Sequence, residues 1–283
     1  MALEGAVLTA HFQDPPLLVD LAELEMRRDG GKGNADLACN SDLECAKANL
    51  QRALAIDDAY MPAYDKLALY YIRLAHKRAG SRALELGQLV CSQAIRKDPS
   101  FAAVHNTAGL IENELGQVNG AVREFETAAK LDPRLFEAHM NLALVNLSFR
   151  GFERAEAAFG RALELRPNDY EAHLGLALAL RGEIAGTSTQ RQLAAVEREL
   201  AAAKSIDPNR PDAYYNGAIL SSEFKLRAAQ TPAEVRASLD ESKALFEEFL
   251  TKARGRAGYD VATQRAQERL RDLATIEETM LGH

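Results

Sequence analysis

Residues 121–133 read AVREFETAAKLDP, and residues 155–167 read AEAAFGRALELRP. The two segments carry Ala, Phe, Ala and Pro at the same offsets, and residues 87–99 repeat the pattern more loosely, with Gly and Cys in the first two places. Together with two more distant copies, the segments end at Asp58, Pro99, Pro133, Pro167 and Pro208. The intervals are 41, 34, 34 and 41 residues, and self-similarity at such a period indicates stacked repeats.

Each copy is typical of the second helix of a two-helix repeat. Ala155, Phe159 and Ala162 are spaced i, i+4 and i+7, so they lie on one face of a helix. Pro167 then ends the helix, because proline lacks the N–H of the hydrogen-bond ladder and disfavours helical geometry in the preceding residue. We therefore expect small residues to allow close approach between helices and the phenylalanine to fill the packing seam.

The first helix of each repeat also recurs. A ring-bearing residue precedes two aliphatic or small residues, at offsets of three and four, and the ring-bearing residues are Tyr64, His105, His139, His173 and Tyr214. The pattern predicts helices over 16–28, 41–56, 60–77, 82–96, 100–115, 118–131, 134–149, 152–165, 169–183, 189–206, 211–229, 233–254 and 258–281. The two seven-residue excesses over the period fall between paired helices, around 76–82 and 183–189, where insertions leave the stack undisturbed.

This pattern resembles the tetratricopeptide repeat family, in which an aromatic residue, Leu, a small residue and later Ala, Phe, Ala and Pro recur. The resemblance covers roughly residues 16–255, but Tyr or His replaces the family's Trp, and the second expected Tyr survives only as Tyr71. It implies an all-α, right-handed α-α superhelical solenoid of about six helix pairs, forming a single domain over residues 1–283. The unpaired, highly charged segment 258–281 is expected to cap the last repeat.

Composition argues against several classes of function. The chain has 283 residues, of which 47% are hydrophobic and 27% charged, as in folded proteins. Its net charge of −7 disfavours nucleic-acid binding, because phosphates are bound by basic surfaces. No apolar run reaches the ~18–20 residues of a membrane span. The start, MALEG, lacks the features of a signal peptide, which predicts a cytoplasmic protein or a chain trimmed of its leader.

We expect neither enzymatic activity nor a cofactor, because no catalytic motif occurs. His105, His139 and His173 occupy one position in successive repeats, on the order of 10 Å apart. A metal needs its nitrogen ligands within about 2 Å, so the three histidines are expected to be structural, in the place of the family's Trp. The segment Gly30-Gly-Lys-Gly33 lacks the full phosphate-loop pattern and is interpreted as a turn.

Two cysteines flank the start of a predicted helix. Ser41 and Glu44 have capping-box spacing, which places Cys39 just before the helix and Cys45 one turn inside it. A disulfide between them would imply an oxidising compartment, and the alternative is two unrelated thiols in a reduced cytosol. Cys91 occupies the place of the seam phenylalanine, which predicts an inert core thiol.

In the resembled family the first helices line a concave groove. The inward positions here are Asp65, Leu69, Ile72, Arg73, Asn106, Leu110, Asn113, Met140, Asn141, Leu144, Leu147, Leu174, Leu178, Arg181, Tyr215, Asn216 and Ile219. Some members clamp a C-terminal carboxylate with Lys, Asn and Arg, but the matching places hold Asp65, Asn106, Glu171 and Gly175. An apolar groove with interspersed Asn suits an amphipathic helix or an extended segment of a protein partner. The alternatives are occlusion by the chain's own C-terminal helix and self-association.

The expected function is therefore a non-enzymatic scaffold for protein–protein interaction. The alanine-rich repeats and paired cysteines further resemble bacterial envelope lipoproteins of this family, such as those of myxobacterial gliding motility or type IV pilus secretin assembly. That resemblance implies a periplasmic protein tethered to the outer membrane through a segment absent from this chain. The alternative is a cytoplasmic adaptor or a regulatory domain cut from a larger enzyme, although the closing polar helix favours a complete array.

Overall fold

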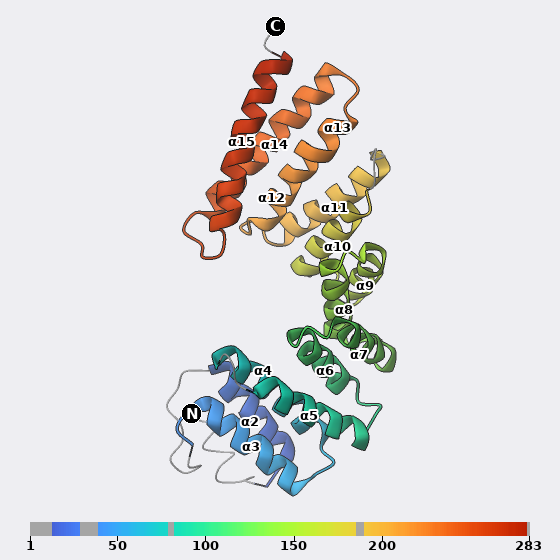
Figure 1. The fold of residues 1–283 in the computed structure, drawn as a ribbon, viewed down its shortest axis with the longest axis vertical. Helices are drawn as coiled ribbons and strands as arrows, with labels where there is room; N and C mark the ends of the chain where they lie inside the picture. Colours follow the sequence, from blue (N-terminus) through green and yellow to red (C-terminus); the bar gives the residue numbers. More distant parts are fainter. Residues whose placement is uncertain (1–12, 29–38, 79–81, 185–189, 282–283) are drawn as a thin grey trace. The chain divides into compact units, whose positions relative to one another are not determined.

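The computed structural model describes residues 13–28, 39–78, 82–184 and 190–281, which form helices and no strand (Figure 1). The helices are α2 (Pro15–Arg28), α3 (Asp42–Ile56), α4 (Met61–Lys77), α5 (Ala83–Lys97), α6 (Ala102–Glu114), α7 (Val118–Leu131), α8 (Phe136–Ser148), α9 (Phe152–Leu165), α10 (Tyr170–Gly182), α11 (Gln190–Ile206), α12 (Asp212–Ile219), α13 (Leu226–Ala228), α14 (Pro232–Ala253) and α15 (Asp260–Leu281). This order confirms the all-α fold of helix pairs followed by one further helix. The right-handed path of the array stays a prediction.

Three predictions fall on residues outside those described. The chain start and the glycine-rich segment 30–33 lie there entirely, and the two seven-residue excesses lie there in part, at 79–81 and 185–189.

The predicted helix 211–229 is interrupted by a π-helical turn, η2 (Leu220–Lys225). Two serine hydroxyls compete there with the regular backbone ladder for the carbonyl oxygen of Ala218. Ser222 Oγ donates to it at 2.8 Å, and Ser242 Oγ of α14 donates to it at 3.0 Å. Such side-chain bonds explain why the helix departs locally from the geometry that periodicity predicts.

The chain divides into two compact units, Met1–Val145 and Asn146–His283, called here the N-terminal and C-terminal units. In the N-terminal unit the pairs α2–α3, α4–α5 and α6–α7 pack together, and the first helices α2, α4 and α6 are neighbours. In the C-terminal unit α10 packs against α9, α11 and α12, and α14 packs against α12 and α15. The assignment of the whole chain to one domain stays a prediction.

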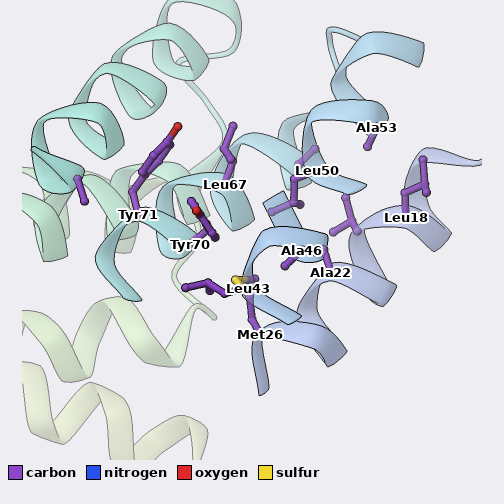
Figure 2. Close-up of a cluster of buried hydrophobic side chains, with 13 residues drawn as sticks. Leu18, Ala22, Met26, Leu43, Ala46, Leu50, Ala53, Leu67, Tyr70 and Tyr71 are labelled. Atoms are coloured by element: carbon purple, nitrogen blue, oxygen red, sulfur yellow. The ribbon is translucent and has the colours of Figure 1, made fainter. Parts of the chain in front are cut away.

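Small and large side chains alternate in the core as the repeat predicts. In the N-terminal unit, Phe125 is buried and its ring lies against Gly109, where an added Cβ would come within 2.6 Å of the ring. In the C-terminal unit, Phe159 meets Gly175 in the same manner, at 2.2 Å. Figure 2 shows the cluster of the first two pairs, in which alanines of α2 and α3 let leucines and tyrosines interdigitate.

The ring-bearing position of the first helix makes one recurrent bond. Each ring donates to the carbonyl oxygen six residues earlier, in the turn that ends the preceding repeat. The bonds are Tyr64 to Asp58 at 3.1 Å, His105 to Pro99 at 3.0 Å, His139 to Pro133 at 3.0 Å, His173 to Pro167 at 2.9 Å and Tyr214 to Pro208 at 3.0 Å. Tyr and His can both occupy this position because each has a ring that carries a hydrogen-bond donor.

Helix α15 buries one face and exposes the other. Ala266 and Leu273 are buried in a cluster with Phe246 and Phe249 of α14. Its other face carries exposed charges, and Arg269 reaches back to Glu223 at 2.5 Å. This arrangement fits the capping role predicted for the segment.

Candidate functional site

The N-terminal unit contains a pocket of about 590 Å³ lined by α2, α4 and α6. It brings together four predicted groove residues, which are Leu69, Ile72 and Arg73 of α4 and Leu110 of α6. The three apolar side chains are half-buried and form its floor with Met26. The other lining residues are Glu23, Arg27, Lys66, His76, Lys77 and Glu114. We call this site the Arg73 pocket.

The prediction from sequence missed the contribution of α2, namely Glu23, Met26 and Arg27. A pattern that could have revealed it is present. Residues 18–22 carry Leu-x-x-Leu-Ala, which matches the spacing at 64–68 except that Leu replaces the ring. In that register the three α2 residues take the positions that the predicted groove residues have in α4. Because α2 has Leu18 in place of the ring-bearing residue, the sequence pattern did not identify it as the first helix of a repeat.

Charged groups of the Arg73 pocket are only partly paired. Arg27 and Lys66 share the carboxylate of Glu23, at 2.5 and 3.4 Å. Burial tends to raise the pKa of Glu23, but the two cations prevail and lower it. Arg73 Nη1 donates to the backbone carbonyl oxygen of Met26 at 2.5 Å, which orients the guanidinium without neutralising it. The pocket therefore combines an apolar floor with an oriented cation.

Groove residues of α6 and α8 are less available than the sequence suggests. Asn141 Nδ2 donates to Asn106 Oδ1 at 2.9 Å, so the two predicted amides bond each other, and Asn106 is buried. Met140 is also buried, whereas Asn113 is exposed and Leu144 is 46% exposed.

The carboxylate-clamp positions do not form a basic site. Asp65 is buried and accepts a hydrogen bond from Thr107 Oγ1 at 2.5 Å, and burial raises its pKa. Glu171 pairs with Arg210 at 2.6 Å. A buried acid and a paired acid cannot replace the cations that a chain-end carboxylate requires.

In the C-terminal unit, a second pocket of about 600 Å³ contains Arg181, Tyr215 and Ile219, all predicted groove residues. Its other lining residues are Glu223 and, from α15, Arg265, Glu268, Arg269 and Asp272. Tyr215 and Ile219 also pack against the buried cluster that includes α15. In this unit the chain's own last helix therefore covers part of the predicted groove. We call this site the α15 pocket.

The remaining polar groove residues of the C-terminal unit bond one another. Arg181 Nη1 donates to Asn216 Oδ1 at 3.0 Å, and Asn216 Nδ2 donates to the carbonyl oxygen of Asp212 at 2.9 Å. Burial lowers the pKa of Arg181, although a guanidinium stays charged near neutral pH. Leu174 is buried and Leu178 half-buried. Little of this set remains open for a partner.

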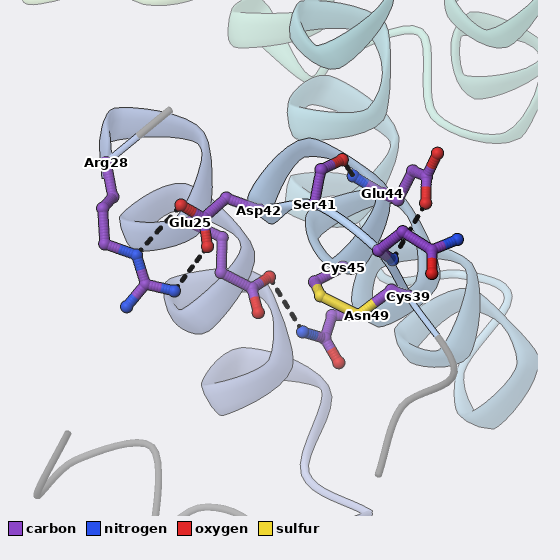
Figure 3. The surroundings of a disulfide bond; sticks show 9 residues. Glu25, Arg28, Cys39, Ser41, Asp42, Glu44, Cys45 and Asn49 are labelled. Atoms are coloured by element: carbon purple, nitrogen blue, oxygen red, sulfur yellow. Dashed lines mark hydrogen bonds and ion pairs between the residues drawn. A yellow bond between two sulfur atoms is a disulfide. The ribbon is translucent and has the colours of Figure 1, made fainter. Parts of the chain in front are cut away.

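Cys39 and Cys45 are bonded in the structure, with their Cα atoms 5.2 Å apart (Figure 3). Ser41 caps α3 by accepting a hydrogen bond from the backbone N–H of Glu44 at 3.3 Å. The Glu44 carboxylate accepts from the N–H of Asn40 at 3.0 Å, one residue earlier than in a standard capping box. The bond and the cap together fix the start of α3.

The cysteine and histidine side chains that could carry chemistry are buried or paired within the protein. Cys91 is buried, and burial raises the pKa of its thiol, which disfavours the reactive thiolate. His105 Nδ1 lies 2.7 Å from Glu124, and His173 Nδ1 lies 2.8 Å from Glu199. Among the described residues, no group of three or more His, Cys, Asp or Glu side chains is placed to hold a metal ion.

No described helix is both long and apolar enough to cross a membrane.

Comparison with known proteins identifies the repeat and the fold. Residues 109–148 match the family model described as TPR repeat, whereas no curated protein matches the chain in sequence. PilF of Pseudomonas aeruginosa shares the fold at 18% identity, with a TM-score of 0.64 over 95% of this chain and 100% of that one.

Two further solved structures are similar in fold. YrrB, described as a TPR protein with an unusual peptide-binding site, is 17% identical, with a TM-score of 0.58 over 77% of this chain and 97% of its own. PilW, described as a widely conserved type IV pilus biogenesis factor, is 20% identical, with a TM-score of 0.55 over 84% of this chain and 97% of its own. At these identities the likeness is one of fold.

Proposed function

We propose that this chain, in which residues 109–148 match a TPR repeat and the helix pairs are stacked, is a non-enzymatic scaffold that binds a segment of a partner protein on its first helices. The observation that carries this proposal is the Arg73 pocket, where Leu69, Ile72 and Leu110 form an apolar floor beside an oriented cation. Concave apolar sites with a few polar groups are typical of ligand and peptide sites. The description of YrrB as peptide-binding adds support from a protein of similar fold.

The groove assignment is tested with a partner identified by cross-linking in cells and then purified. Leu69→Glu and Leu144→Glu each place a charge among the predicted groove residues. Leu131→Glu on α7, 40% exposed and outside that set, is the matched control. We expect the two groove variants to weaken binding by at least about tenfold, since each desolvates a charge against an apolar contact, and the control to bind normally. Unchanged affinity in both groove variants would refute the assignment of these residues to the partner-binding groove.

We further propose that the protein acts in the bacterial envelope, as part of a gliding-motility machine or a pilus secretin assembly. It would work in the periplasm, tethered to the outer membrane through a segment outside this chain. Two observations support this proposal. The fold is shared with PilF and PilW, and the Cys39–Cys45 bond suits an oxidising compartment. Mass spectrometry of alkylated protein from the periplasm tests it, and free thiols at both cysteines would favour a cytoplasmic adaptor instead.

A further inference from the structure

We infer that the Arg73 pocket selects a partner helix that carries acidic side chains beside its apolar anchors. The inference rests on the proposed function and adds the charge of the partner. It concerns the N-terminal unit alone, where every residue of the pocket lies.

The charge of the lining is opposite to that of the chain. Four lining residues carry a permanent positive charge, namely Arg27, Lys66, Arg73 and Lys77, and two carry a negative charge, Glu23 and Glu114. With His76 neutral, four positive and two negative charges leave the lining at +2, in a chain whose net charge is −7. A locally positive concave surface on an acidic protein attracts carboxylates and orients their approach.

Arg73 is the group best placed to receive a carboxylate. Its one hydrogen bond goes to the carbonyl oxygen of Met26, in the last turn of α2, and among the described residues no carboxylate forms an ion pair with it. A guanidinium has five N–H donors in a planar fork, so most of them remain for a ligand. A carboxylate oxygen pair fits that fork in a bidentate manner.

The apolar floor of the pocket determines which other residues the partner should carry beside the carboxylate. Leu69, Ile72 and Leu110 are half-buried side chains from neighbouring helices, and they lie in one pocket with Arg73. A helix with apolar residues at i, i+3 and i+4 could cover the floor while acidic residues on the border of that face reach the cation. The occupant that fits is therefore an amphipathic helix with an acidic margin.

The test uses fluorescence anisotropy with the full chain and a labelled amphipathic peptide that carries Leu on one face and Glu on both margins. Counterparts with Gln or Lys in place of Glu are titrated in parallel. We expect the Glu peptide to bind about tenfold tighter than the Gln peptide, as for a charge-assisted hydrogen-bonded pair. The preference should decline with added salt.

Two matched variants test whether the preference for the Glu peptide arises at Arg73. Arg73→Glu should abolish it, whereas Lys130→Glu, the same charge change at an exposed lysine of α7 outside the pocket, should preserve it. Arg73→Gln retains an amide donor for the Met26 carbonyl but loses the charge. A loss of preference in a variant with unchanged circular dichroism and melting temperature therefore cannot be attributed to unfolding.

Three outcomes would overturn the inference. Equal binding of the Glu and Gln peptides, weakened by Leu69→Glu, would leave groove binding intact and refute the charge selection. Binding of no peptide would refute the inference and leave the proposed function to the experiment on its purified partner. Sedimentation as a dimer that Arg73→Glu converts to a monomer would assign the pocket to a second copy of the chain.

Discussion

Some of the predicted groove residues line one pocket in each compact unit, and the two pockets differ in what surrounds their arginines. In the N-terminal unit, Arg73 bonds only a backbone carbonyl, and its apolar neighbours are half-buried. In the C-terminal unit, Arg181 bonds Asn216, and α15 supplies four charged side chains to the lining. The groove residues around Arg73 thus remain open in the N-terminal unit, whereas those around Arg181 serve the chain's own packing in the C-terminal unit.

The difference follows from helix α15. Its apolar face, with Leu273 and Ala266, is buried against α14. That face is covered by packing on the sixth repeat, so Tyr215 and Ile219 become part of an internal cluster. Position within the array, as well as residue type, decides whether a groove side chain is available to a partner.

The largest expected effect compares the loss of unfolding free energy on truncating a buried side chain of α15 with the loss on truncating a half-buried side chain of the Arg73 pocket. Leu273→Ala should lower the free energy of unfolding by about 2–4 kcal/mol, because it opens a cavity in a buried cluster. Leu69→Ala, on the half-buried floor of the Arg73 pocket, should cost less than about 1.5 kcal/mol. Urea unfolding with hydrogen exchange resolved by helix measures both losses. Equal losses would contradict the distinction between an internal and an open face.

Reduction of the disulfide should affect the N-terminal unit alone, because all three cysteines lie there. The Cys39–Cys45 bond closes a short loop, for which the chain-entropy model gives about 2 kcal/mol. Hydrogen exchange with and without reductant should show faster exchange in α2 and α3 and no change in the C-terminal unit. A variant with serine at both cysteines is the control, and an equal response of that variant to reductant would refute the assignment.

A pH response is also expected in the N-terminal unit. The hydrogen bond with Glu124 raises the pKa of His105, against the opposing effect of burial. The folded pKa then exceeds the unfolded value of ~6.5, so the stabilisation is full below that value and is lost as pH rises through the folded pKa. We expect a decrease of about 1 kcal/mol between about pH 6 and pH 9, measured by urea unfolding.

The control for the pH response is Glu124→Gln, which removes the charged partner of His105. It should flatten the response of the N-terminal unit. The contact between His173 and Glu199 in the C-terminal unit is not altered by this variant. The intervening repeat has Ala158 at the position of Glu124 and offers no such carboxylate. An unaltered pH response in the variant would exclude His105 as its source.

The smallest effect concerns the surface of the α15 pocket. Arg269→Ala removes an ion pair with Glu223 between side chains that are 45% and 31% exposed. Such a pair contributes ~0–1 kcal/mol and less in high salt, because water and ions screen it. Peptide binding at the Arg73 pocket should not change. A large loss of stability, measured by thermal unfolding, would show that the α15 pocket depends on the ion pair more than on its apolar contacts.

The groove shows how far sequence reasoning extends. The register placed Leu69, Ile72 and Arg73 on one helix face, and the structure brings all three into one pocket. The same register could not reveal that Asn106 and Asn141 bond each other, because that depends on how far two neighbouring helices are apart. It also missed Met26, because the ring that identifies a first helix is replaced in α2.

The sequence by itself determined the helix pairs, the seam phenylalanines and the recurrent ring-bearing position of the first helices. These features depend on spacing along one or two helices, and such spacing repeats whatever lies further away. Only the tertiary structure decided that Arg73 remains open while Arg181 is internally bonded, and that α15 covers Tyr215 and Ile219. Whether a groove side chain is available to a partner depends on which other part of the chain packs against it. That packing follows from the arrangement of the helices in space and cannot be derived from the repeat period.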